Sequence, residues 1–361
     1  GNTGALLSAH QSIGVPQPLK LFGTPDQKER FFPRLAKGEI SAFALTENEV
    51  GSDPANMSTL AEPSKDGSHF VINGEKLWCT NGLKAGLFVV MAQTPPKIVR
   101  GKERRQITAF IVERDMPGVE IATRCRFMGL KALYNGIIRF KDVKVPRENI
   151  ICAEGKGLRV ALTTLNTGRL TLPAACTGAS KVCLRIAREF AAEREQWGAK
   201  SGKHEAIAQK IAFIASHTFA QEAISFYTSA LVDRGQADIR LEAAMCKMFC
   251  SEVSWDIIHE TLQIRSGRGF ETASSLRNRG EKGVPIERFM RDCRINMIFE
   301  GTSEIMRLFL AREALDPHLR LAGDLLNPRA PFPARAKSFL QATLHYIGSV
   351  SYTHLTLPTK A

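Results

Sequence analysis

The chain has 361 residues, of which 44% are hydrophobic and 24% are charged, and its formal net charge is +13. This composition is that of a globular protein long enough for two or three domains, and it excludes a disordered or fibrous chain. The sequence contains no run of 18 or more apolar residues and no export signal at its start, so we expect no transmembrane helix.

The excess of basic residues would suit an anionic ligand, a nucleic acid or an acidic membrane surface. The basic residues alternate with acids, as in KERRQ and AREFAAEREQ, and no basic stripe with aromatic residues is present, so we expect no nucleic-acid binding. Eight cysteines lie apart without a CxxC pair, which predicts reduced thiols and no metal site.

Residues 1–42 are expected to be helical. Thr24 is a typical helix N-cap, Pro25 suits the first turn, and Phe31 and Leu35 recur at helical spacing. This segment predicts a helical region that precedes the next domain.

A change of pattern marks residues 43–152. Short apolar runs such as GLFVVMAQT and QITAFIVERD are separated by Asn-Gly, Pro-Gly and Pro signals, which predicts an antiparallel β domain. The pair Asn73-Gly74 is the clearest turn signal.

Helical periodicity returns after Gly157 and predicts a four-helix bundle over residues 153–315. The expected helices are roughly 157–194, 204–234, 238–264 and 284–315. Prolines then indicate a linker, followed by a short helix, so residues 316–350 are expected to be a linker and the start of an extra helical region. Residues 351–361 match neither pattern and are expected to be a non-native tail.

Two polar stretches of the β domain are candidate binding segments. In FALTENEVGSD, residues 43–53, hydroxyls and backbone N–H groups near a glycine could hold a polar heterocycle, or form an ordinary capped turn. In NGEKLWCTNG, residues 73–82, Trp78 could stack on a planar ring beside a threonine hydroxyl, or pack in the core.

Three stretches of the helical region carry arginines that could bind an anion. They are NTGR (166–169), EREQWG (193–198) and LQIRSGRGF (262–270). A guanidinium on an apolar helix needs an anionic partner, although a solvated helix charge explains each one equally well. The glycines of RSGRG follow a helix and not a strand, which excludes a dinucleotide-binding fingerprint.

A fourth candidate is NMIFEGTSEI, where Glu300 stands between apolar residues and Gly301. The pattern fits a helix C-cap followed by a new helix, with an incidental acid. It also fits a carboxylate removed from water, whose pKa would be raised and which would then be a stronger base.

The order of these motifs resembles that of the acyl-CoA dehydrogenase family of flavoproteins. ALTE...GSD, GxKxWxTNG, MGLKA...FKDVKVPRENI, NxGR, RxQWG, QI..G.GF, RD and IFEGTSEI follow one another at the family's spacings, from about residue 5 to about residue 320. The resemblance implies an α+β multidomain fold with a partial N-terminal α domain, a β-barrel-like middle domain and a C-terminal four-helix bundle. It also implies FAD as the cofactor.

Transferred by motif, the residues that would contact FAD fall in three groups. The first group lies in the middle domain, and in it Trp78 would pack on the isoalloxazine and Thr80 would approach N5. The second group, in the helical region, would reach the FAD of a neighbouring subunit. The third group comes directly after the candidate base Glu300 in the sequence. The groups are Phe43, Leu45, Thr46, Gly51, Ser52, Trp78, Cys79 and Thr80; Arg194, Gln196, Trp197, Gln263 and Gly267; and Thr302 and Glu304.

The resemblance implies that Glu300 removes the α-proton of a fatty acyl-CoA while the β-hydrogen leaves as hydride. The backbone N–H of Glu300 would hold the thioester carbonyl, and the substrate contacts would be Ser52, Asn166, Arg169 and Gly301. Some family members place the base on an earlier helix, near residue 168 here, where Gly168 cannot serve.

Two departures from the family pattern concern one region. QIRSGRG replaces the frequent QIFGGNG, which adds Arg265 and Arg268, and the ten residues ASSLRNRGEK, 273–282, are inserted after it.

The NxGR motif and the helix expected after the bundle resemble long-chain members with an extra C-terminal domain. The resemblance then implies an electron-transferring flavoprotein as acceptor, a homodimer or homotetramer, and peripheral membrane contact of the full-length protein. It implies a cytoplasmic location in a bacterium or the mitochondrial matrix in a eukaryote. The alternatives are a flavin oxidase or monooxygenase on the same fold, a non-catalytic assembly or scaffold homologue, and a plain helical interaction module.

Overall fold

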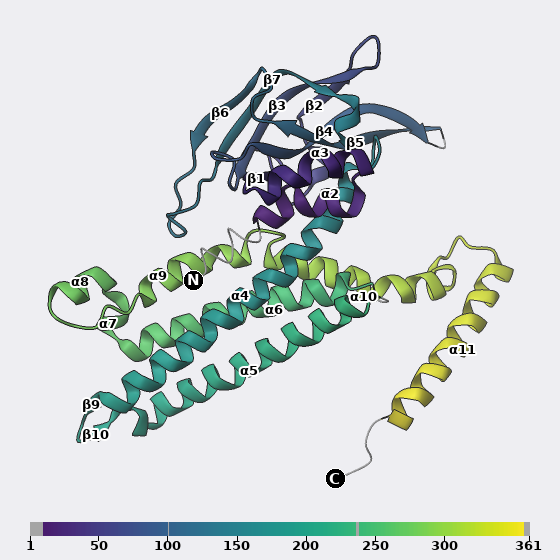
Figure 1. The fold of residues 1–361 in the computed structure, drawn as a ribbon. Helices are drawn as coiled ribbons and strands as arrows, with labels where there is room; N and C mark the ends of the chain where they lie inside the picture. The colour runs from purple at the N-terminus through teal and green to yellow at the C-terminus, as the bar shows by residue number, and fades with distance from the viewer. Residues whose placement is uncertain (1–9, 100, 236–237, 357–361) are drawn as a thin grey trace. The chain divides into compact units, whose positions relative to one another are not determined.

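The computed structural model describes residues 10–99, 101–235 and 238–356 (Figure 1). They fall into two units that divide between Ser303 and Glu304. None of the helices described is both long and apolar enough to cross a membrane. The beginning of the expected N-terminal helical segment, residues 1–9, and the end of the expected non-native tail, residues 357–361, lie outside the described residues.

The N-terminal part of the first unit is helical, as predicted. Residues 10–14 are helical, and α2 (Pro16–Phe22) and α3 (Pro25–Ala36) follow. Thr24 caps α3: its hydroxyl accepts from the Gln27 backbone N–H, and the Gln27 side chain accepts from the Thr24 N–H. This reciprocal cap satisfies two N–H groups that a helix start leaves unpaired.

An eight-stranded sheet follows. Its strands are β1 (Ser41–Ala44), β2 (Leu60–Pro63), β3 (His69–Cys79), β4 (Leu87–Val99), β5 (Lys102–Glu113), β6 (Val119–Arg124), β7 (Gly136–Pro146) and β8 (Ile150–Ile151). The order is β6-β7-β3-β2-β4-β5-β8, with β1 paired to β4. Most pairs are antiparallel, but β1 and β2 both run parallel to β4, which the antiparallel expectation missed. The short helices η1 (Pro54–Asn56) and η2 (Arg147–Asn149) lie in its connections.

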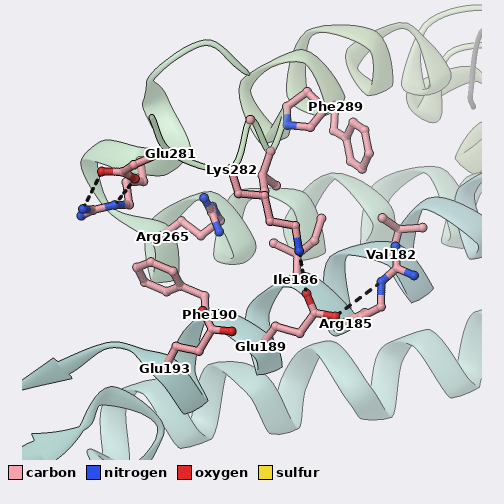
Figure 2. A pocket seen from close by; sticks show the side chains of 14 residues that line it. Val182, Arg185, Ile186, Glu189, Phe190, Glu193, Arg265, Glu281, Lys282 and Phe289 are labelled. Carbon is pink, nitrogen blue, oxygen red and sulfur yellow. Dashed lines mark hydrogen bonds and ion pairs between the residues drawn. The ribbon is translucent and has the colours of Figure 1, made fainter. Parts of the chain in front are cut away.

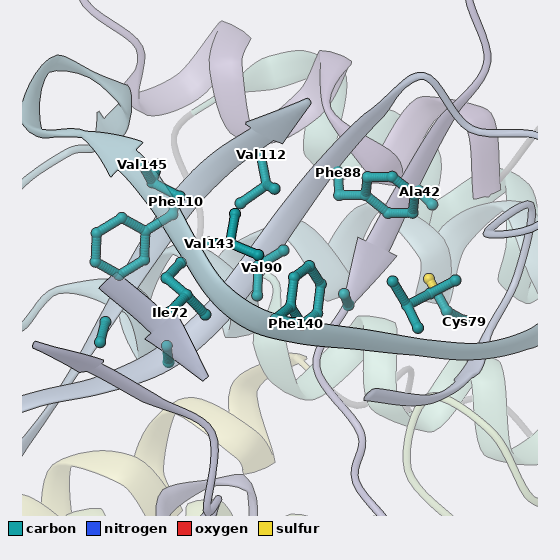
Figure 3. Packing of buried hydrophobic residues seen from close by; sticks show 14 of the residues in the cluster. Ala42, Ile72, Cys79, Phe88, Val90, Phe110, Val112, Phe140, Val143 and Val145 are labelled. Carbon is teal, nitrogen blue, oxygen red and sulfur yellow. The ribbon is translucent and has the colours of Figure 1, made fainter. Parts of the chain in front are cut away.

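The sheet is buried on both faces of its central strands. On β4, Phe88 and Val90 belong to a cluster enclosed by the strands (Figure 3), whereas Leu87 and Val89 belong to a second cluster. The second cluster includes residues of α2, α3 and the first turns of the next long helix. Alternate residues of a strand point to opposite faces, so the two cores lie back to back across β4 and β5.

The prediction of a turn at Asn73-Gly74 is wrong. Both residues lie within β3, where the pairing with β7 shifts register between Ile72 and Gly74. The glycine is needed because a Cβ at this position would fall 2.7 Å from the Thr59 Cα. A glycine inside a strand therefore marks a bulge and a close backbone approach here.

Three long helices form most of the helical region (Figure 1). The elements are α4 (Gly157–Glu193), β9 (Glu195–Gln196), β10 (Ala199–Lys200), η3 (Ser201–Lys203), α5 (Glu205–Arg234), α6 (Arg240–Arg265), α7 (Gly267–Phe270), α8 (Ala273–Asn278), α9 (Ile286–Cys293) and η4 (Arg294–Met297). Apolar side chains of α4, α5, α6 and α9 share one core. The first three predicted helices are confirmed to within two residues, but the fourth is not continuous: it breaks at 298–302.

The second unit contains α10, whose first residue is Ser303 and which ends at Leu326, and α11 (Phe332–Thr356). The prediction that a linker begins at residue 316 is wrong, because α10 continues through Pro317 to Leu326. A proline can remain inside a helix when the loss of one hydrogen bond is absorbed by a bend. His318 Nδ1 lies within hydrogen-bond distance of the Tyr346 hydroxyl, so α10 and α11 contact each other. α11 also enters the segment expected to be a non-native tail.

Candidate functional site

Glu300 lies on the non-helical loop 298–302. Its backbone has a φ of 55°, in the left-handed region, and Gly301 follows with a φ of 97°. A residue with a side chain in this region costs about 1–2 kcal/mol, which surrounding contacts must offset. The break expected at Glu300 is therefore present, and its geometry is strained.

The carboxylate of Glu300 is held against α4. A Cβ at Gly168 would fall 2.5 Å from both carboxylate oxygens, so the glycine leaves the space that the carboxylate fills. Oε2 is shielded from water and has no hydrogen-bond partner among the described residues. Burial raises the pKa of Glu300 to about 7, against the opposing effect of two cations. Such a group is poised to accept a proton near neutral pH.

The two cations are Arg169 on α4 and Lys247 on α6. Arg169 donates from Nε to the Glu300 carbonyl at 3.4 Å and from Nη1 to the Asn166 Oδ1 at 3.1 Å. The fully buried Lys247 donates from Nζ to the Gly301 carbonyl at 2.7 Å. Both cations hold the loop by its backbone carbonyls, and neither makes a hydrogen bond to the carboxylate in the part of the chain that is described.

Lys247 was not among the candidates from the sequence. It stands in AAMCKMFC, where a lysine interrupts an apolar stretch, and this was the available signal. Burial lowers the pKa of Lys247 to about 8, with the Glu300 charge opposing that change. A buried lysine is rare without an anionic or carbonyl partner, which marks the position as functional or structural.

A second group of candidates lies at the end of β3. The indole of Trp78 is 57% exposed, on a backbone with a φ of 54°. A register shift between Lys76 and Cys79 accompanies this conformation, and the Cys79 thiol is buried and contacts the Phe43 carbonyl at 3.6 Å. The bulge thus leaves an aromatic face open while its neighbour enters the core.

Asn135, also missed from the sequence, orders this edge. Its Nδ2 donates to the Trp78 carbonyl and to the Thr80 Oγ1, both at 2.9 Å, and its buried Oδ1 has no hydrogen-bond partner within the described ranges. Leu133, two residues earlier, shares a core cluster with Phe299, the neighbour of Glu300. The loop before β7 therefore connects the exposed indole to the loop that carries the carboxylate.

The segment with the remaining middle-domain candidates is anchored by a buried ion pair. Lys76 Nζ lies 2.7 Å from Glu47 Oε1, and it also donates to the Leu45 carbonyl. The Glu47 carboxylate accepts further hydrogen bonds from Ser58 and from the Thr59 N–H. Phe43, Leu45 and Thr46 are half-buried, whereas Gly51 and Ser52 are exposed at the tip of the segment.

The candidates for contact with a neighbouring subunit lie elsewhere in the chain. Arg194 follows α4, 25 residues after Arg169, which is about 38 Å along a helix axis. The β9–β10 hairpin stands at the end of the long helices away from the sheet (Figure 1). All five of these residues, Arg194, Gln196, Trp197, Gln263 and Gly267, are exposed. Within one chain, Arg194 is therefore far from Arg169, and all five residues are open to contact with another molecule.

Thr302 and Glu304 follow Gly301 at the start of α10, Glu304 in its first turn. Among the described residues, no group of three or more His, Cys, Asp or Glu side chains is placed to hold a metal ion.

Three segments of the chain match three domains of one family. The matches are "Acyl-CoA dehydrogenase, N-terminal domain" over residues 1–39, the middle domain over residues 42–143 and the C-terminal domain over residues 155–315.

The chain is also similar in sequence to individual proteins of this family. The chain is 54% identical over 343 residues to the probable acyl-CoA dehydrogenase FadE10 of Mycobacterium tuberculosis, covering 95% of this chain and 52% of that protein. It is 41% identical over 331 residues to the very long-chain specific acyl-CoA dehydrogenase, mitochondrial, of Bos taurus. This alignment covers 90% of this chain and 49% of that protein. The chain thus spans about half the length of these relatives.

Among solved structures, the acyl-CoA dehydrogenase from Bacillus anthracis complexed with FAD aligns with a TM-score of 0.75 and 33% identity. The alignment covers 88% of this chain and 56% of that one.

Proposed function

The chain belongs to the acyl-CoA dehydrogenase family, and on this premise we propose that it oxidises a fatty acyl-CoA to the trans-2-enoyl-CoA with Glu300 as the base. The observation that supports this proposal is the buried carboxylate of Glu300 on a strained loop, whose Oε2 has no hydrogen-bond partner among the described residues and whose pKa is raised to about 7. The cations beside it contact backbone carbonyls, so the carboxylate remains available to a substrate.

The residues at the end of β3 fit FAD, the cofactor named for the Bacillus anthracis relative. Trp78 offers an exposed aromatic face, Thr80 a hydroxyl, and Asn135 a buried oxygen that no described residue contacts by a hydrogen bond. A planar heterocycle with a hydrogen-bonding edge would cover the first and approach the second. When bound, FAD would supply the acceptor for a hydride.

The proposed reaction assigns a role to each of these residues. One oxygen of Glu300 accepts the α-proton, and the electron pair of that C–H bond forms the double bond as the β-hydrogen leaves as hydride. The backbone N–H of Glu300 holds the thioester carbonyl, which stabilises the charge that develops on its oxygen. Gly301 leaves room for the thioester, and Ser52, Asn166 and Arg169 are the proposed substrate contacts.

Replacing Lys247 with Met is expected to lower kcat/KM and to shift its acidic limb to higher pH. The ammonium opposes the rise of the Glu300 pKa, so its removal raises that pKa further. On the acidic limb, a pKa that is higher by one lowers the fraction of Glu300 present as carboxylate about tenfold. Lys181→Met, which removes a half-exposed lysine paired with Glu222, is the matched control. An unchanged pH profile in Lys247→Met would show that the lysine acts only on folding.

Replacing Gly168 with Ala is expected to reduce turnover by about tenfold or more, because the new methyl group would meet the Glu300 carboxylate at 2.5 Å. Gly178→Ala is the control, since a Cβ there meets nothing within 4 Å on the same helix. Steady-state kinetics and flavin content should be measured together. Turnover equal to that of the Gly178 variant would contradict the close packing of α4 against the carboxylate.

We further propose that the full-length protein acts on long acyl chains and passes electrons to an electron-transferring flavoprotein. The similarity to a very long-chain specific enzyme supports the first point. Contact with a neighbouring subunit is supported by Trp197, 91% exposed, and Phe270, 81% exposed, on the segments predicted to reach a neighbour's FAD. Large exposed aromatic residues are typical of interfaces.

An anaerobic titration of the full-length, FAD-loaded protein with acyl-CoAs of graded length tests the proposed function. Bleaching of the flavin absorbance is expected, most completely with long chains. Loss of bleaching with every acyl-CoA would reject the dehydrogenase and favour a non-catalytic homologue. Rapid oxygen consumption with acyl-CoA would instead identify a flavin oxidase.

A further inference from the structure

A cavity of about 650 Å³ lies in the helical region, outside the groups of residues described above (Figure 2). One wall is the C-terminal half of α4, and the other is formed by the end of α6, by α7 and by the segment before α9. Apolar side chains and charged side chains both line it. None of the residues predicted to bind FAD or substrate is among its lining residues.

Arg265, the last residue of α6, is the most unusual group in this cavity. It is only 8% exposed, and its Nε has no hydrogen-bond partner among the residues that the structure describes. Its guanidinium carbon lies 5.0 Å from the centroid of the Phe190 ring, so the ring covers one face of the group. No carboxylate among the described residues lies within ion-pair distance of it. A buried guanidinium normally has a hydrogen-bonded anion.

The other cations of the cavity are already paired, whereas the carboxylate of Glu193, which also lines it, has no ion-pair partner among the described residues. Arg268 makes two hydrogen bonds to Glu281, at 2.6 and 2.8 Å. Lys282 and Arg185 share Glu189, at 3.6 and 4.0 Å. The pairing in Figure 2 therefore leaves Arg265 as the lining cation without a partner in the part of the chain described, and no dashed line reaches it.

Four of the residues that line the cavity depart from the family pattern. Arg265 and Arg268 are the two added arginines, and Glu281 and Lys282 belong to the ten-residue insertion. Arg268 pairs with Glu281 of the insertion, and Lys282 of the insertion pairs with Glu189 of α4. Residues that depart from the family pattern therefore form one side of the polar lining, and Arg185, Glu189 and Glu193 of α4 form the other.

We propose that this cavity binds a small organic anion, a carboxylate with a short apolar group, with the carboxylate on Arg265. The planar guanidinium can donate two parallel hydrogen bonds to such a group while Phe190 covers its face. Ile186, Val284 and Phe289 supply apolar walls for the remainder of the ligand. A carboxylate on Arg265 would give the buried cation the partner that the chain does not supply.

Titration of the FAD-loaded, full-length protein with hexanoate by calorimetry tests the proposal, with 1-hexanol and inorganic phosphate as separate probes. Hexanoate is expected to bind at one site per chain, and Arg265→Met is expected to weaken it by about tenfold or more, as loss of a charge-assisted pair requires. Arg188→Met removes an exposed arginine of α4 that does not line the cavity and should leave binding unchanged. Phosphate is expected to bind more weakly than hexanoate, and hexanol not at all.

Lys282→Met is the second variant, because the Lys282 side chain is 82% exposed and its loss should not affect folding. It should weaken hexanoate binding by about two- to fivefold, since one cation near the anion is lost. Equal binding by the parent and both variants would overturn the proposal. Competition between hexanoate and acyl-CoA, or loss of FAD from Arg265→Met, would also overturn it, because the cavity would then belong to the reacting site or to the cofactor site.

Discussion

Replacement of Glu300 by Gln is expected to abolish exchange of the substrate α-proton with solvent and bleaching of the flavin by acyl-CoA. The amide has the size of the carboxylate but cannot accept the proton, and loss of a positioned base lowers rates by about 10⁴-fold. FAD should remain bound, because its proposed contacts lie mainly on β3 and the segment before it. Anaerobic mixing with acyl-CoA in D₂O measures exchange and bleaching in one experiment.

The control for this variant is Glu260→Gln, which removes a carboxylate of α6 that pairs with Lys210 away from the loop. It should retain exchange and bleaching. Full reduction of the flavin in Glu300→Gln would place the base on another residue, and retained exchange without reduction would do the same.

The parent protein, which has the Glu300 carboxylate, has a predicted pH signature. The raised pKa of Glu300, about 7, means that kcat/KM should rise as pH passes through 7 and then level off, because only the carboxylate is the base. The contribution of Glu300 to folding stability changes with pH in the opposite direction to kcat/KM. A raised folded-state pKa gives stability that is fully present below the ordinary value of 4.5 and is lost as pH rises through about 7. At pH 8, Glu300→Gln should therefore be more stable than the parent, by up to about 3 kcal/mol.

Glu47→Gln is expected to produce the second large effect, a loss of about 3–5 kcal/mol of stability and of bound FAD. Burial alone would raise the pKa of Glu47, but Lys76, Ser58 and Thr59 outweigh it and lower the pKa to about 2. The amide would leave the fully buried Lys76 ammonium without its counter-charge. The segment that carries Thr46 and Ser52 would lose its anchor.

Thermal unfolding monitored by flavin fluorescence measures this change, and a fall of roughly 10 °C is expected for the middle domain. Glu75→Gln is the control, since Glu75 pairs with Arg139 in an exposed ion pair worth under about 1 kcal/mol. Combining Glu47→Gln with Lys76→Met should recover most of the lost stability, because the unpaired charge is then gone. A double variant as unstable as Glu47→Gln alone would show that the pairing of charges is not the cause.

Several features could be predicted from local sequence because their causes are local. The cap at Thr24, the three long helices and the break at Glu300 depend on residues within one or two turns of each other. The motif order indicated the family, and the matches over residues 1–315 agree with it. The prediction failed where a local signal is compatible with two structures. Asn73-Gly74 forms a bulge and not a turn, and Pro317 lies inside α10 and does not end it.

The sequence by itself thus determined the α, β, α order of the chain, its family and the carboxylate that is the candidate base. Only the tertiary structure decided what surrounds that carboxylate. Lys247 holds the loop from 54 residues away in sequence, and Arg169 holds it from 131. Burial and charge pairing depend on residues that meet through packing, and no periodicity of the sequence records those contacts. The same reason applies to Arg265. In the sequence it is only the last residue of a helix, and the structure shows that it lines a cavity and that its Nε has no hydrogen-bond partner among the described residues.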